Sequence, residues 1–130
     1  MILRRDYWMD KYEKLIAVFS ETLEQSRDYH IAYIYQVGYV SVLGMYESDS
    51  TPNNSMKIDE VFRSPEEMAD SLLRNWRWQW FYENRKLLGC QDYEDICNLD
   101  SEVPELLREE YRQSIGMLQS KIHIVLKAEN

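Results

Sequence analysis

The chain has few of the residues that end secondary structure or build covalent and metal frameworks. Its 130 residues include 4 glycines, 3 prolines, 2 cysteines and 2 histidines. So little glycine and proline excludes a collagenous or linker-like protein, and 45% apolar residues argue against disorder. Cys90 and Cys97 are too few for a disulfide framework or a structural zinc site, so we expect reduced thiols, no metal and no cofactor.

Long apolar runs are missing too. The longest nearly uncharged run, residues 31–46, contains several polar side chains and is shorter than the roughly 18 apolar residues that a membrane helix needs. Residues 1–6 do not contain the apolar stretch of a signal peptide. We therefore expect a cytoplasmic protein that does not associate with membranes.

Motifs of catalysis are also absent. The sequence has no zinc-binding histidine pair, nucleophile elbow or glycine-rich phosphate loop, and His30 and His123 each stand alone. Acidic neighbours of Cys97 disfavour its thiolate. One carboxylate, Glu83, falls on the apolar side of a predicted helix near Trp76, where it would either form a salt bridge or act in acid–base chemistry. The sequence favours a non-enzymatic protein. A small enzyme with a carboxylate-based site is the third and least favoured function, after the docking protein and the acidic inhibitor described below.

Hydrophobic periodicity predicts the first elements. Residues 6–27 carry apolar side chains at the 3.6-residue spacing of a helix, with Asp6 as a candidate N-cap. Residues 30–46 alternate in aromatic and β-branched side chains, which predicts a hairpin turning near Gly38 rather than one long strand. Residues 56–62 are a candidate third strand.

The clearest local signal is the segment 64–67, Ser-Pro-Glu-Glu. Serine as N-cap, proline at the first helical position and glutamate at the third form a capping box. The predicted helix runs over 65–88 and stops at Gly89. A short helical turn is expected over 92–99.

The remaining elements complete one domain over residues 1–130. A last helix is predicted from Pro104, although the β-branched residues within 121–126 suit a strand as well. The polar, turn-forming segment 47–55 is predicted to be a mobile surface loop. The fold class is then α+β, a small single domain with about three main helices packed on a short antiparallel β-hairpin or three-stranded sheet.

The segment 74–82 is the most unusual part of the chain, because its nine residues hold three tryptophans, a phenylalanine, a tyrosine and two arginines. On the predicted helix the core side carries Met68, Leu72, Leu73, Trp76, Trp80 and Leu87. The opposite side, which we name the aromatic–arginine face, carries Arg74, Arg77, Trp78, Phe81 and Arg85.

Aromatic and arginine side chains dominate binding hot spots and suit cation–π contacts. We therefore predict the aromatic–arginine face to be the docking surface for a protein partner. Two alternatives stay open. The helix could be buried on all sides, or a patch at Trp78 and Phe81 could join copies of the chain into a homo-oligomer.

Acidic residues are concentrated between residues 92 and 110. Eight acids against the single base Arg108 give this stretch a charge of −7, of the −8 carried by the whole chain. The acids are Asp92, Glu94, Asp95, Asp100, Glu102, Glu105, Glu109 and Glu110. A net charge of −8 argues against direct binding of nucleic acid. The stretch is either a solvated face or, as the alternative function, the surface of an acidic inhibitor that mimics nucleic acid and occupies the basic groove of a nucleic-acid-processing enzyme.

Overall fold

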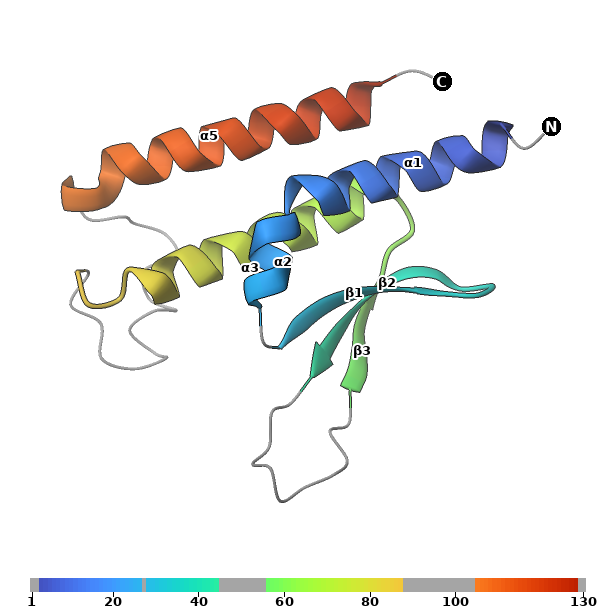
Figure 1. Cartoon of the computed structure of the whole chain (residues 1–130), viewed down its shortest axis with the longest axis horizontal. Helices are drawn as coiled ribbons and strands as arrows, with labels where there is room; N and C mark the ends of the chain where they lie inside the picture. Colours follow the sequence, from blue (N-terminus) through green and yellow to red (C-terminus); the bar gives the residue numbers. More distant parts are fainter. Residues whose placement is uncertain (1–2, 27, 45–55, 88–104, 129–130) are drawn as a thin grey trace.

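The computed structural model describes residues 3–26, 28–44, 56–87 and 105–128. These residues form the helices α1 (Leu3–Val18), α2 (Ser20–Gln25), α3 (Pro65–Glu83) and α5 (Glu105–Lys127), and the strands β1 (Tyr29–Ile34), β2 (Gly38–Gly44) and β3 (Met56–Val61). The three long helices contact one another and lie side by side above the sheet, with α5 running opposite to α1 and α3 (Figure 1). The predicted α+β fold is confirmed.

The strands form one antiparallel sheet in the order β1-β2-β3, so the predicted hairpin and third strand are both confirmed. The hairpin turn is formed by residues 35–37 and is closed by the Val37 N–H, which donates to the Ile34 carbonyl at 2.9 Å. Gln36 has a φ of 67° and Gly38 a φ of 113°, a value that strongly favours glycine. Gly38 is the first residue of β2 and directly follows the turn.

A β-bulge interrupts the pairing of β2 with β3. Ser41 pairs with Glu60 and the next residue of β2 pairs with Ile58, so Asp59 has no partner. The Glu60 N–H donates instead to the Ser41 hydroxyl at 3.1 Å. The extra residue restores the alternation so that Ile58 and Val61 share the outer face of the sheet, while Glu60 faces the helices.

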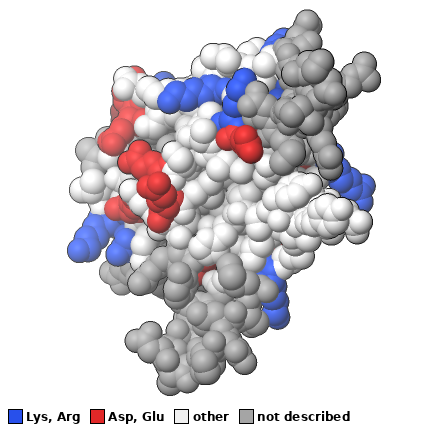
Figure 2. All heavy atoms as spheres, turned by 45° about the vertical axis from the view of Figure 1, so that its right-hand side comes forward, with Lys and Arg blue, Asp and Glu red and all other residues white. Residues whose placement is uncertain are grey.

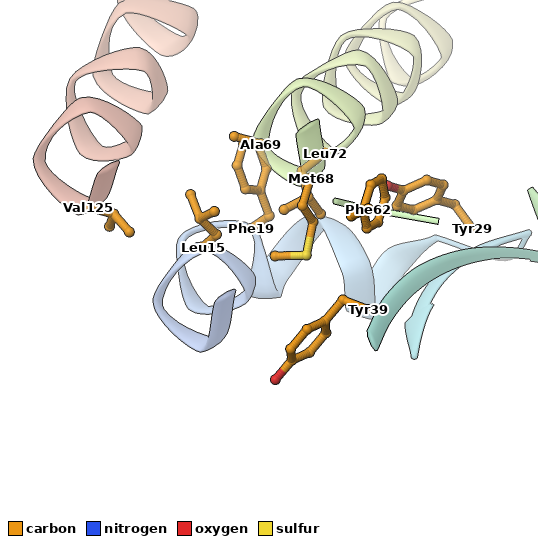
Figure 3. Close-up of a cluster of buried hydrophobic side chains, with 9 residues drawn as sticks. All are labelled: Leu15, Phe19, Tyr29, Tyr39, Phe62, Met68, Ala69, Leu72 and Val125. Carbon is orange, nitrogen blue, oxygen red and sulfur yellow. The ribbon is translucent and has the colours of Figure 1, made fainter. Parts of the chain in front are cut away.

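The main core lies between α1, α3 and the sheet (Figure 3). Non-aromatic side chains of α3 meet a leucine of α1 and the aromatic rings of the neighbouring segments, and α5 adds one residue at the side. Its buried members are Leu15, Phe19, Tyr29, Tyr39, Phe62, Met68, Ala69, Leu72 and Val125. Burying this apolar surface is what holds the helical layer on the sheet.

The N-terminal region differs from the prediction. The single helix expected over 6–27 is wrong, because the chain leaves helical geometry at Phe19, with φ −106° and ψ 17°, and continues as α2. The ring of Phe19 is buried in the main core, so packing fixes the change of direction without a proline or glycine to mark it in the sequence. The helix also begins at Leu3, which places Asp6 inside α1 rather than at its N-cap.

The capping box at the start of α3 is confirmed. The Ser64 hydroxyl accepts the Glu67 N–H at 3.2 Å, and the Glu67 carboxylate accepts the Arg63 N–H at 3.1 Å. The helix ends at Glu83 rather than at residue 88, and the Asn84 side chain closes it by donating to the Trp80 carbonyl at 2.8 Å.

At the other end of the chain, residues 121–126 are helical and belong to α5, so the strand alternative is wrong. The predicted loop 47–55 and the predicted helical turn 92–99 lie outside the described residues, as do Cys90 and Cys97. Within the described part of the chain, no helix is both long and apolar enough to span a membrane.

Candidate interaction surface on helix α3

The second half of α3 packs against the start of α5 through aromatic rings. The ring of Tyr111 on α5 stacks on Phe81 with centroids 5.6 Å apart, meets Trp80 edge-on at 5.0 Å and lies parallel to Trp76 at 5.9 Å. Leu107, one turn earlier on α5, is buried in the same cluster. Tyr111 is therefore the centre of an aromatic cluster that joins α3 to α5.

This packing removes Phe81 from the aromatic–arginine face. Its side chain is only 2% exposed, so it stabilises the contact with α5 and is not available to a partner. Helical periodicity places Phe81 on the side of α3 opposite Trp76 and Trp80. Tyr111 of α5 nevertheless contacts all three rings. The sequence of α3 alone does not show from which direction another helix will pack.

Two of the arginines of the face make contacts within the chain. Arg74 forms an exposed salt bridge with Glu60, with one guanidinium nitrogen 3.0 and 3.1 Å from the two carboxylate oxygens. The half-buried Arg77 donates from Nε to the Tyr111 hydroxyl at 2.7 Å. Arg74 thus ties α3 to the sheet, and Arg77 ties α3 to α5.

The other residues of the face form a row with Tyr82 in which Tyr82 is exposed and Trp78 and Arg85 are half-buried. The indole of Trp78 lies on the ring of Tyr82, with centroids 5.2 Å apart and an interplanar angle of 11°. The guanidinium of Arg85 also lies over the Tyr82 ring, 4.0 Å from the ring centroid, and donates to the Tyr82 carbonyl at 2.7 Å. We name Trp78, Tyr82 and Arg85 the α3 ladder.

Tyr82 is the member of the α3 ladder that sequence reasoning missed. Its side chain is 41% exposed, the most of any aromatic residue described on α3. The signal was present in the sequence, because Tyr82 follows Trp78 by four residues, and residues four apart lie next to each other on one helix face. Arg85 extends the same row by one further step of three residues.

Three of the predicted acidic-surface residues are described, and all three are exposed on the first turns of α5. They are Glu105, Glu109 and Glu110, and Glu109 accepts a hydrogen bond from Gln113 at 3.2 Å. The other five, Asp92, Glu94, Asp95, Asp100 and Glu102, lie outside the described residues. Whether the eight acids form one continuous surface therefore stays a prediction.

The candidate acid–base group does not occupy the expected position. Glu83 is exposed at the last residue of α3, so the expectation that it lies on the apolar side is wrong. The reason is that α5 covers the side of Phe81 rather than the side of Glu83. His123 is exposed as well, and the described residues contain no group of three or more side chains suited to holding a metal ion.

Among the described residues, the titratable group with the largest pKa shift has a structural role. Burial raises the pKa of Tyr29 to about 12, and the Tyr29 hydroxyl lies 2.6 Å from the Ser71 hydroxyl inside the main core. Burial also raises the pKa of Tyr12 and of Tyr39, whose rings stack 4.5 Å apart. These tyrosines are neutral at physiological pH and join the sheet to the helices.

Comparison with models of known protein families, with curated proteins and with solved structures found no match to this chain. The function is therefore argued from the residues of the chain itself.

Proposed function

We propose that this protein is a non-enzymatic protein-interaction module that docks through the α3 ladder, Trp78, Tyr82 and Arg85. The observation that carries this proposal is the stack itself: an indole, a phenol ring and a guanidinium held against one another at the end of α3, with the phenol ring exposed. Tryptophan, tyrosine and arginine are the residues most enriched among binding hot spots.

Preorganisation supports the choice of this surface. Binding usually costs about 0.5–1.5 kcal/mol for each flexible side chain that is immobilised. In the α3 ladder the Arg85 guanidinium is already held by the Tyr82 ring and by the Tyr82 carbonyl. Trp78 itself packs against the aromatic cluster that joins α3 to α5. A partner therefore meets a surface whose shape is set before contact.

The chemistry of the ladder indicates the chemistry of the partner. The Trp78 and Tyr82 rings offer an apolar platform, and Arg85 with the exposed Lys86 gives one end of it a positive charge. We propose a cytoplasmic protein partner that seats an apolar side chain on the rings and directs a carboxylate toward Arg85. Contacts of this kind rest mainly on buried apolar area, so they persist at high salt.

The experiment is affinity capture from nuclease-treated native extract, with washes at low and at high salt. It compares the wild-type chain with Tyr82→Ala and with Tyr35→Ala, a matched control because Tyr35 is 77% exposed at the hairpin turn, away from α3. We expect one stoichiometric protein that resists high salt, is retained by Tyr35→Ala and is lost with Tyr82→Ala. Both variants should unfold at temperatures close to that of the wild type, because exposed substitutions usually change stability by less than about 0.5 kcal/mol.

The same experiment distinguishes the alternative function, the acidic inhibitor. A nucleic-acid-processing enzyme that is captured at low salt and released at high salt would point to the exposed acids of α5. Reversing Glu105 and Glu109 to lysine would then abolish capture, while Tyr82→Ala would not. A partner that Tyr82→Ala retains contradicts docking through the α3 ladder.

A further inference from the structure

The two edges of the sheet are built differently. Strand β3 carries Lys57, Asp59 and Glu60 and is interrupted by the bulge at Asp59, and charges and bulges are the usual means of protecting an edge from pairing with another strand. Strand β1 has no charged residue, no proline and no irregularity in its register with β2. Among the described residues, no strand pairs with its outer side. Within the described part of the chain, the outer side of β1 is therefore an open edge.

The bonding pattern with β2 shows which backbone groups face outward. The carbonyls of Asp28 and Ile34 accept hydrogen bonds from the β2 side, at 2.8 and 2.9 Å. Residues of an antiparallel strand alternate between bonding to one side and to the other. The N–H and C=O groups of Tyr29, Ile31 and Tyr33 therefore point to the open edge.

These outward-facing residues form a palindrome: tyrosine, isoleucine, tyrosine, centred on Ile31. We propose that two copies of the chain pair antiparallel through their β1 edges, about a two-fold axis beside Ile31, to make one continuous sheet across a dimer. The axis pairs Ile31 with Ile31 of the second copy and Tyr29 with Tyr33 of the second copy. Every outward N–H then meets a carbonyl, and no backbone group of the edge is left without a partner.

The side chains fit the same arrangement. The ring of Tyr33 is 51% exposed and meets Tyr39 edge-on at 5.1 Å, so one of its sides is covered within the chain and the other is open. In the dimer that open side lies beside the second copy at the position of Tyr29, whose own ring stays in the main core.

Charge favours a second copy at this place. Each chain carries a net charge of −8, so two copies repel wherever acidic surfaces meet. Neither β1 nor its neighbour β2 contains a charged residue, and Figure 2 shows a broad area without charged side chains across the middle of the face that it draws. A foreign strand could bond to the edge as well, but only self-pairing accounts for the palindrome.

The first test uses the unmodified protein. Sedimentation equilibrium from micromolar to millimolar concentration should show a monomer–dimer equilibrium. Residue-resolved amide exchange over the same range should show that the Ile31 and Tyr33 N–H groups become protected as the dimer forms. The Ala32 N–H, which points toward β2, should be protected at every concentration.

The second test compares two tyrosine-to-lysine variants. Tyr33→Lys introduces a charge at the edge and should weaken dimerisation at least about tenfold, whereas Tyr35→Lys, two residues away in the hairpin turn, should leave it unchanged. A monomer up to millimolar concentration overturns the proposal. So does a dimer in which the Ile31 and Tyr33 amides exchange as fast as in the monomer, or an equal effect of both variants. If Tyr33→Lys does not fold, the exchange measurement on the unmodified chain decides alone.

This inference does not depend on the proposed docking surface. The α3 ladder and the β1 edge belong to different elements, and Tyr82→Ala should leave the dimer intact. Loss of partner capture and loss of dimerisation are therefore separable results.

Discussion

The two halves of helix α3 belong to cores that are enclosed to different extents. The first half contributes Met68, Ala69 and Leu72 to a core that has α1 on one side and the sheet on another. The second half contributes Trp80 and Phe81 to a cluster closed by the start of α5. Non-aromatic side chains of α3 fill a space that several elements surround, whereas a single covering helix is held by aromatic rings. The second half also carries the α3 ladder, of which Tyr82 is exposed.

The largest effect on stability is expected in the enclosed half. Leu72 is 1% exposed, so Leu72→Ala should leave a cavity that the surrounding elements cannot close, and should lower the free energy of unfolding by about 3 kcal/mol. Denaturant unfolding followed by circular dichroism measures the change. Leu87→Ala is the matched control, because Leu87 is 64% exposed and should cost less than about 0.5 kcal/mol. Similar losses for both variants would mean that the first half of α3 is not enclosed as described.

A second change tests the polar contact between the first half of α3 and the sheet. Tyr29→Phe removes the hydrogen bond to Ser71 and leaves a buried hydroxyl without its partner, so it should cost about 1–2 kcal/mol near neutral pH.

The pH dependence of stability should change in the same variant. In the folded chain the pKa of Tyr29 is about 12, whereas a tyrosine in an unfolded chain has a pKa of 10.0. Between these two pH values the folded state therefore binds more protons than the unfolded state. The stabilisation from Tyr29 is complete below pH 10 and is lost as the pH rises toward 12. Denaturant unfolding across this range should show a smaller decline for Tyr29→Phe than for the wild type. The raised pKa values of Tyr12 and Tyr39 preserve part of the decline in both proteins.

The smallest effect is expected in the half closed by one helix. Phe81→Leu keeps the site apolar and removes only part of the ring stack with Tyr111, so it should cost about 1 kcal/mol. Thermal unfolding monitored at two wavelengths gives the change, and near-ultraviolet circular dichroism should report altered tryptophan and tyrosine packing. A loss of unfolding free energy as large as that of Leu72→Ala would contradict the expected difference between the two halves of α3.

The sequence predicts those parts of the fold that depend on local chemistry. The capping box at Ser64 identifies the start of α3 to the residue, because an N-cap serine, a proline and a glutamate each satisfy a separate requirement of a helix N-terminus. The alternation around Gly38 identifies the hairpin for a similar reason, since strand periodicity and a turn residue coincide there.

Features that depend on distant neighbours could not be predicted in this way. Phe19 interrupts a pattern that is helical on both sides of it, and only its burial against α3 and the sheet explains the change of direction. Phe81 and Glu83 exchange their expected environments because α5 approaches from the side of Phe81. The candidate site was therefore found in part: Trp78 and Arg85 were assigned to it from the sequence, and Tyr82 was added by the structure.

The bulge in β3 has a consequence for how this chain tolerates changes in its length. If Asp59 were deleted, Ile58 and Glu60 would follow each other directly and would pair with consecutive residues of β2, as they do now. Val61 would keep its place on the outer face and Glu60 would still face Arg74. A deletion in a strand usually reverses every side chain that follows it, but here it removes the one residue that has no partner. In an alignment with a homologous chain one residue shorter, the gap belongs at position 59, inside a strand, rather than in a neighbouring turn.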